Sequence, residues 1–232
     1  MLTLLLQALP AFAAPPAPPA CSVTLEVAVA EAGDPLERQV YRYDADADEW
    51  LYVSYDGGPP PPEEVEQFEE RGRDGGDRSD DPVRPAAYYA DSVEKLSGAW
   101  TRLSGPNEDG LALYGLEELP EDTVVANGRD LSDFIRLRYV IDQSGPEPVL
   151  AVAGGQLKRA WRIPLIARIS AFDIERHFAP AGPETGAPGV MLPTKEHVEI
   201  AASILGRDRS AVIDTRFTDW DCAPAERAEP PV

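Results

Sequence analysis

The sequence predicts a mainly β fold of the α+β class, in which a curved antiparallel sheet or incomplete barrel packs against one or two short helices. Apolar and polar side chains alternate along segments such as 22–30 and 134–142, and this period of two is typical of half-buried strands. Glycine, proline and aspartate bound these segments as turn signals. The strands do not alternate with helical patterns of about 10 to 15 residues, which excludes a doubly wound parallel sheet.

The first part of the chain is predicted to hold three strands and two short helices. One helix is expected over residues 63–71, because Pro62 stands near its first position and two glutamates follow in its first turn. Another is expected over residues 85–97, where apolar side chains recur at helical spacing until Gly98. The three strands are residues 22–30, 39–44 and 50–55.

The remainder of the chain is predicted to be almost entirely β. Residues 117–132 are interpreted as an irregular acidic connection, and Gly154-Gly155 as part of a turn. The predicted strands are residues 99–104, 111–115, 134–142, 149–152, 157–163, 165–178, 194–205 and 210–217.

The N-terminal residues predict export. A leucine-rich run is followed by Ala11-Phe12-Ala13, the small-x-small pattern of a signal-peptidase site, although no Lys or Arg precedes Arg38. A buried N-terminal strand or helix is the alternative, and Pro10 with the Ala/Pro stretch behind it disfavours that alternative. The expected location is therefore periplasmic or secreted.

The predicted organisation has a single folded domain. Its acidic insertion is expected to be mobile, because glycine, aspartate and arginine offer little apolar surface to offset the entropy of ordering. The segments are a signal peptide at 1–14, an Ala/Pro leader at 15–21, a β-rich domain at 22–222 with the mobile insertion at about 57–84, and a tail at 223–232.

The charge of the chain limits its partners. Asp and Glu total 41 against 21 Lys and Arg, which gives a formal net charge of −20. Nucleic acids and anionic bilayer surfaces need clustered Lys and Arg, so neither is an expected partner. No apolar run reaches the roughly 18 residues of a transmembrane helix, so no integral membrane span is expected.

Two cysteines stand near the ends of the predicted domain. Cys21 opens the first strand and Cys222 follows the last one. Exported chains meet oxidising conditions, which favours a disulfide between the two. A pair of free buried thiols is the alternative, and a metal site on two cysteines without a CxxC motif is disfavoured.

The last long strands place two sets of side chains on opposite faces. We place the centre of one connection near Ala187 and the centre of the next turn between Arg207 and Asp208. Antiparallel pairing about these centres predicts the cross-strand pairs Glu175–Glu199, His177–His197 and Glu199–Arg216. The set expected to line the core or a cavity is Phe172, Ile174, Phe178, Val198, Ile200, Ile204, Ile213 and Phe217. The polar set is Glu175, His177, His197, Glu199 and Arg216.

The polar set has two interpretations. It is either a solvated face, in which Arg216 relieves the repulsion between opposed glutamates, or a Zn²⁺ site, since imidazole and carboxylate groups suit that ion. The solvated face is the preferred interpretation. No Walker loop, G-x-G-x-x-G, G-x-S-x-G or H-E-x-x-H motif is present. We therefore assign no catalytic residue, metal or cofactor, and the protein is not expected to be an enzyme.

The order of elements, with early strands, a short helical section and long antiparallel strands to the end, resembles the LolA/LolB/LppX-like superfamily of periplasmic lipid and lipoprotein carriers. The finish Arg216-Phe217-Thr218-Asp219-Trp220 is similar to the terminal strands of such proteins. The resemblance covers most of residues 22–220. It implies an incomplete barrel wrapped around helices, with an apolar cavity that takes acyl chains.

This resemblance implies a function in binding. The expected partner is a hydrophobic small molecule, a lipid or a lipoprotein, held inside the curved sheet. A ligand-free structural or protein-interaction module of the periplasm is the alternative. A metal-binding protein or enzyme that uses the His/Glu face of the last hairpins comes third.

Overall fold

The computed structural model describes residues 21–73, 101–121, 124–126, 129–145, 148–163, 167–187, 190–204 and 206–222. The predicted signal peptide at 1–14, residues 15–20 of the leader, the predicted helix at 85–97 and the tail at 223–232 lie outside the described residues. No helix in the described ranges is long and apolar enough to cross a membrane.

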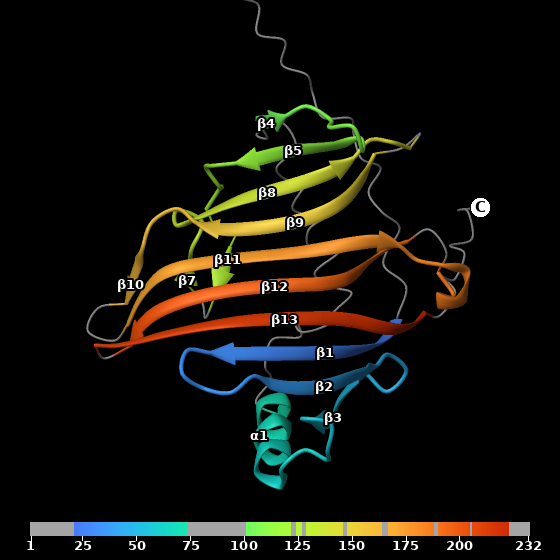
Figure 1. Ribbon diagram of the computed structural model, residues 1–232, viewed down its shortest axis with the longest axis vertical. Helices are drawn as coiled ribbons and strands as arrows, with labels where there is room; N and C mark the ends of the chain where they lie inside the picture. The colour runs from blue at the N-terminus through green and yellow to red at the C-terminus, as the bar shows by residue number, and fades with distance from the viewer. Residues whose placement is uncertain are drawn as a thin grey trace, which may run out of the picture.

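The fold is an antiparallel sheet of eleven strands that curves without closing (Figure 1). Hydrogen-bonded neighbours follow the order β3-β2-β1-β13-β12-β11-β9-β8-β5-β4, and β10 pairs with β11 beside this path. The strands are β1 (Cys21–Glu31), β2 (Glu37–Asp44), β3 (Glu49–Tyr55), β4 (Thr101–Ser104), β5 (Leu111–Leu116), β8 (Ile135–Asp142), β9 (Val149–Leu157), β10 (Trp161–Ile163), β11 (Ala167–Pro180), β12 (Met191–Ile204) and β13 (Arg207–Cys222). The mainly β, antiparallel prediction is confirmed.

The irregular connection predicted over residues 117–132 contains a small β ladder. Strands β6 (Val125–Ala126) and β7 (Arg129–Asp130) pair with each other outside the large sheet. Leu119, Val124 and Leu131 of this connection pack against buried Leu116, Ile135 and Leu137. The connection therefore covers part of the core.

Strands β1 and β13, far apart in sequence, lie side by side in the sheet (Figure 1). Cys21 and Cys222 are partners in this register and form a disulfide, with Cα atoms 3.9 Å apart. Both cysteines are buried against Ala187 and Leu192. The predicted disulfide is therefore confirmed, and it links residues separated by 201 positions in the sequence.

Alternation along the strands gives the sheet an apolar face and a polar face. In β8, Leu137, Tyr139 and Ile141 are buried on the apolar face, while Arg136 and Arg138 point to the polar face. Buried side chains of β5, β8, β9 and β11 form a core cluster on the apolar face. Its members are Ala112, Tyr114, Tyr139, Ile141, Ala153 and Phe178.

Helix α1 (Pro62–Arg73) lies in the segment predicted as a mobile insertion. It sits beside β2 and β3 (Figure 1), where the Phe68 ring centroid lies 5.4 Å from that of Tyr41 and 5.8 Å from that of Tyr52. The Tyr52 hydroxyl donates a 2.8 Å hydrogen bond to Glu64 Oε2. Burial, followed by this hydrogen bond, raises the pKa of Tyr52, so the phenol keeps its proton. Residues 57–73 thus include a docked helix, and residues 74–84 lie outside the described part.

The glycine pair interpreted as a turn lies inside strand β9, so that interpretation is wrong. Gly154 pairs with Arg138 on one side and with Glu175 on the other. A Cβ added to Gly154 would lie 3.0 Å from the backbone oxygen of Ile174 and 3.3 Å from Cγ of Arg138. Glycine suits this position because the Arg138 side chain passes closely over the strand and leaves little room for a Cβ atom. The strand predicted over 157–163 is also divided, since β9 ends at Leu157 and β10 begins at Trp161.

The register of the last two hairpins differs from the prediction, although the faces do not. The predicted pairs Glu175–Glu199, His177–His197 and Glu199–Arg216 are wrong. The observed pairs are Glu175–His197, His177–Lys195, Glu199–Val212 and Lys195–Arg216. The partners are displaced by two residues in the first hairpin and by four in the second. Even displacements leave every side chain on its predicted face.

The turn geometry explains the displacement. Ile204 pairs with Arg207, so the connection between β12 and β13 is two residues long and ends at Gly206, whose φ is 79°. Positive φ in a two-residue hairpin turn favours glycine. In the preceding hairpin, a β-bulge at His177/Phe178 and the 3₁₀ helix η2 (Pro183–Thr185) shift the pairing.

Candidate functional site

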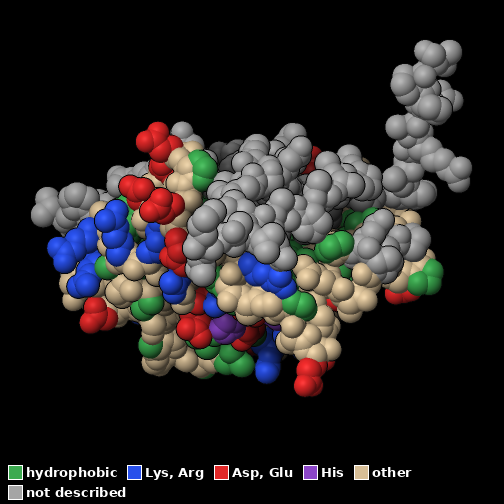
Figure 2. Space-filling model, turned by 90° about the horizontal axis from the view of Figure 1, so that it is seen from above, with side chains coloured by type: hydrophobic (Ala, Val, Ile, Leu, Met, Phe, Trp, Pro, Cys, Tyr) green, Lys and Arg blue, Asp and Glu red, His purple; other side chains and the backbone are tan. Residues whose placement is uncertain are grey.

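The polar face carries an open groove of about 1000 Å³. In the space-filling view of Figure 2, histidine and acidic side chains lie together on one part of the surface. The groove contains every member of the predicted polar set together with further charged residues. The charged residues and histidines of the polar face that line it are Glu26, Arg38, Arg138, Asp173, Glu175, His177, Lys195, His197, Glu199, Asp214 and Arg216.

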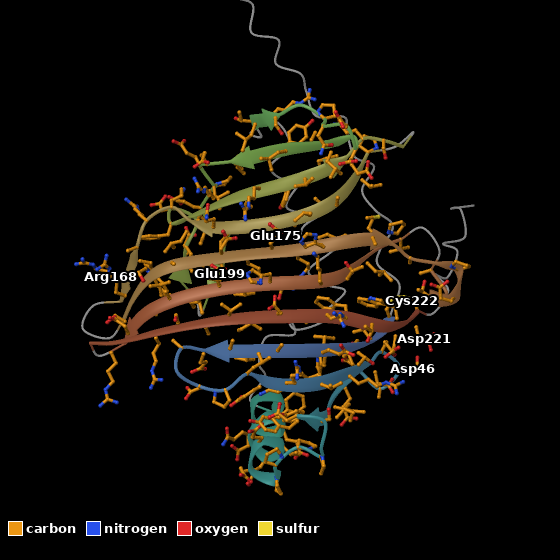
Figure 3. The ribbon with its side chains drawn as sticks, in the orientation of Figure 1. Asp46, Arg168, Glu175, Glu199, Asp221 and Cys222 are labelled. Carbon is orange, nitrogen blue, oxygen red and sulfur yellow. A yellow bond between two sulfur atoms is a disulfide. The ribbon has the colours of Figure 1, made fainter. Side chains whose placement is uncertain are left out.

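The strand register explains why these side chains meet. Asp214, His197, Glu175 and Arg138 form a row across β13, β12, β11 and β8, with Gly154 of β9 between the last two. Acids and bases alternate along this row, and opposite charges across a strand pair stabilise it. Figure 3 shows Glu175 and Glu199 on neighbouring strands but displaced along them, as the register requires.

Arg138 connects β8 to β11 by reaching over Gly154. Its Nη2 donates to Asp173 Oδ1 at 3.0 Å and lies 3.5 Å from Glu175 Oε2. Glu175 Oε1 also lies 2.6 Å from Nε2 of His177. Because a carboxylate only accepts, that histidine nitrogen carries the proton in this contact. Glu175 is therefore held from two sides and is not available as a free carboxylate.

His197 is held between two carboxylates. Its Nδ1 lies 2.7 Å from Asp214 Oδ1, and its Nε2 lies 3.2 Å from Glu199 Oε1. Both contacts are hydrogen bonds only when both ring nitrogens are protonated. The hydrogen bond to Asp214, followed by that to Glu199, raises the pKa of His197. The side chain is 43% exposed, so solvent weakens these contacts.

Some cations of the groove are not neutralised. Lys195 and Arg216 are direct cross-strand partners, and like charges in that position repel. Arg216 Nη1 makes a long, exposed contact of 3.5 Å with Glu26 Oε2. Within the described residues, no carboxylate pairs with the side chain of Lys195 or of Arg38. The groove therefore offers cationic groups to a carboxylate or another anionic group.

The zinc interpretation required the histidines and glutamates to converge on one point. Both histidines do lie on the polar face. In the part of the chain that the structure describes, however, no group of three or more His, Cys, Asp or Glu side chains is arranged to hold a metal ion. The ring of His177 faces Glu175, and that of His197 faces two other carboxylates. We make no metal assignment.

The opposite, apolar face contains a buried ion pair. Arg176 and Glu196 are cross-strand partners on β11 and β12, and Arg176 Nε donates to Glu196 Oε2 at 2.6 Å. Their side chains are only 11% and 14% exposed. The guanidinium carbon lies 5.6 Å from the ring centroid of Phe217. The remaining nitrogen, Arg176 Nη1, is buried, and no described residue accepts a hydrogen bond from it.

The predicted apolar set lies on this second face rather than along the groove. Phe178 and Phe217 are buried, and the side chain of Ile204 lies outside the described part. The half-buried members are Phe172, Ile174, Val198, Ile200 and Ile213. The groove, in contrast, combines charged and polar side chains with the smaller apolar residues Ala28 and Val40.

Several residues of these sites were not identified from the sequence. Asp173 and Asp214 have the same alternation phase as the predicted polar set, so extending that phase along each strand would have included them. To include Arg138 in the site, the strand order β8–β9–β11 must be known as well. Arg176 and Glu196 are charged residues at strand positions where the alternation otherwise places apolar side chains. This exception to the pattern could have identified them.

Comparison with models of known protein families gives no match, and comparison with curated proteins gives none either.

Proposed function

We propose that this chain is an exported binding protein that holds a hydrophobic or lipid-like ligand against the apolar face of its open, curved sheet. The observation that carries the proposal is the difference in burial along that face. The flank formed by β5, β8 and β9 is buried, with Ala112, Tyr139 and Ala153 almost inaccessible. The middle, formed by β11, β12 and β13, keeps Ile174, Val198 and Ile213 only half-buried.

These three aliphatic side chains are consecutive cross-strand partners. Ile174 pairs with Val198, and Val198 pairs with Ile213. They form an apolar strip across the longest strands of the sheet. Burial of such a strip contributes roughly 25 cal/mol per Å² of apolar area, so an acyl chain laid along it gains binding energy. The resemblance to lipid carriers, which implies an incomplete barrel with an apolar cavity for acyl chains, also supports a ligand of this kind.

A matched pair of valines tests this proposal. Val198 is half-buried on the apolar face, and Val212 is half-buried on the polar face of the next strand. Val198→Glu is expected to weaken binding of the neutral apolar dye N-phenyl-1-naphthylamine at least about tenfold, because a carboxylate disfavours an apolar site. Val212→Glu is expected to leave dye binding unchanged. Dye fluorescence titration measures both.

Folding must be separated from binding in this test. Far-ultraviolet circular dichroism establishes that each variant keeps its sheet, and Val198→Thr provides a milder replacement of the same shape with a smaller expected loss. Equal effects of the Val198 and Val212 variants, or no dye binding by the wild type, would contradict the proposal.

A second candidate function is a protein-interaction module that acts through the β3 edge. Strand β3 ends the sheet order, and its Leu51 and Val53 are exposed. Edge strands present backbone groups that an extended peptide can pair with. The acidic residues Asp48, Glu49 and Asp56 near this edge favour a basic peptide.

The edge candidate has a simple test. A short alternating lysine–valine peptide is expected to shift the NMR resonances of β3, and Val53→Pro is expected to abolish the shift, because proline cannot donate a backbone hydrogen bond. An unchanged spectrum with the peptide would reject this candidate.

A further inference from the structure

A belt of polar side chains crosses the otherwise apolar face of the sheet. Cross-strand pairing places the polar residues Arg176, Glu196 and Thr215 side by side over β11, β12 and β13, and the same row continues through the apolar Val27 of β1 to Gln39 of β2. The neighbouring row contains the apolar strip of Ile174, Val198 and Ile213. Polar groups at this depth need hydrogen-bond partners, because an unpaired buried polar group is costly.

The ion pair in this belt is incomplete. Glu196 Oε2 accepts a hydrogen bond from Nε of Arg176 and forms an ion-pair contact with Nη2, which leaves Nη1. That nitrogen is buried, and no described residue accepts from it. A guanidinium has five N–H donors in a fixed plane, and two of them are on Nη1. The free donor is therefore held in place by the same carboxylate and by the ring of Phe217 beneath the guanidinium.

The charge of the pair indicates what would satisfy the free donor. Glu196 already neutralises Arg176 at hydrogen-bonding distance. A second anion at Nη1 would lose its hydration and would also be repelled by the nearby Glu196 carboxylate. A carbonyl or hydroxyl oxygen accepts a hydrogen bond without adding charge. The site therefore favours a neutral acceptor over a carboxylate or a phosphate.

We infer that Arg176 and Glu196 form the polar anchor of the ligand site on the apolar face, and that the ligand is a neutral amphiphile whose carbonyl or hydroxyl oxygen accepts from Arg176 Nη1. This inference rests on the proposed function, which supplies the ligand site itself. The acyl chain of such a ligand lies along the strip of Ile174, Val198 and Ile213. Esters and glycerides belong to this class, and ionised fatty acids do not.

A comparison of two probes with the same acyl chain tests the inference. Monoolein and oleate both displace N-phenyl-1-naphthylamine from a lipid site, and titrations are made on the full mature chain below the aggregation concentration of each lipid. The wild type is expected to bind monoolein about tenfold more tightly than oleate, because the oleate carboxylate loses its hydration and is repelled by the Glu196 carboxylate, whereas the neutral ester of monoolein is not. Glu196→Gln is expected to reduce that preference, because it removes the repelling charge and keeps the shape of the side chain.

Arg176→Lys removes the planar donor and keeps the positive charge, so it is expected to weaken monoolein binding. Arg42→Lys, at an exposed position on the polar face of β2 and outside the groove, is the matched control and is expected to change neither affinity. If Arg176→Lys does not fold, the affinities of monoolein and oleate for the wild type and for Glu196→Gln still test the inference.

The outcomes separate the inference from the function on which it rests. No binding of either lipid would overturn the proposed function and the inference together. Binding of oleate as tightly as monoolein, or an unchanged preference in Glu196→Gln, would overturn the inference and leave the lipid-binding function in place. A variant of Arg176 that lowers stability without changing the preference would likewise assign the pair a structural role alone.

Discussion

Two adjacent residues of β11, Glu175 and Arg176, belong to ion-pair networks with different physical properties. Glu175 lies in the polar groove, where Arg138 and His177 share it in contact with solvent. Arg176 lies on the apolar face, where its pair with Glu196 is removed from solvent. Strand alternation alone separates them. Exposed pairs are worth about 0 to 1 kcal/mol, whereas breaking a buried pair costs roughly 3 to 5 kcal/mol.

The largest expected effect compares one acid from each face. Glu196→Ala leaves the Arg176 guanidinium buried and unpaired, so we expect the free energy of unfolding to fall by roughly 3 to 5 kcal/mol. Glu175→Ala breaks contacts that remain partly accessible to solvent and is expected to lower the free energy of unfolding by at most about 1 kcal/mol. Urea denaturation of both variants measures the difference. Equal losses would show that the two networks do not differ in burial as described.

The paired glycines of β9 offer a smaller comparison. Gly154→Ala places a Cβ 3.0 Å from the Ile174 carbonyl oxygen and 3.3 Å from Arg138 Cγ, so we expect a loss of roughly 1 to 3 kcal/mol from overpacking. Gly155→Ala faces the apolar side, where the nearest atom lies 3.4 Å away. It is expected to be neutral or to stabilise by roughly 0.5 to 1 kcal/mol. Thermal denaturation of the two variants measures these changes in stability. A Gly154→Ala variant more stable than the wild type would contradict the close passage of the Arg138 side chain over β9.

The smallest expected effect is the pH dependence of His197. Its pKa is raised in the folded protein above the ordinary value of 6.5, first through Asp214 and then through Glu199. The stabilisation is therefore fully present below about pH 6.5 and is lost as pH rises through the folded pKa. Because the side chain is largely solvated, the expected contribution is below about 1 kcal/mol.

His197→Gln provides the control for this pH dependence. The stability difference between wild type and variant is expected to be smaller at about pH 8 than at about pH 6, because the stabilisation declines as pH rises from the ordinary pKa through the raised pKa of His197. Urea denaturation at both pH values measures it. A difference that grows as pH rises would contradict the arrangement of His197 between two carboxylates.

The faces of the sheet could be predicted from the sequence more reliably than its register. Alternation places Glu175, His177 and His197 on one face whatever their exact partners, because a displacement by two residues preserves the phase. The partners depend on turns. Gly206 marks a two-residue turn that was available in the sequence, whereas the β-bulge at His177/Phe178 has no comparable signal.

The two sites also differ in how far the sequence indicates them. The groove follows from alternation within β11, β12 and β13, extended by Arg138 once the strand order is known. To identify the polar anchor formed by Arg176 and Glu196, the burial of both side chains must be known as well. Nothing in the sequence says that Arg176 and Glu196 are removed from solvent, or that Nη1 is left without an acceptor among the described residues.

Native mass spectrometry of the protein purified without detergent from the cells that produce it tests the central claim most directly. We expect a bound, non-covalent species of lipid mass on the wild type, retained by Val212→Glu and lost by Val198→Glu. A wild-type protein that carries no such species, or a species that Val198→Glu retains as fully as Val212→Glu does, would contradict ligand binding on the apolar face.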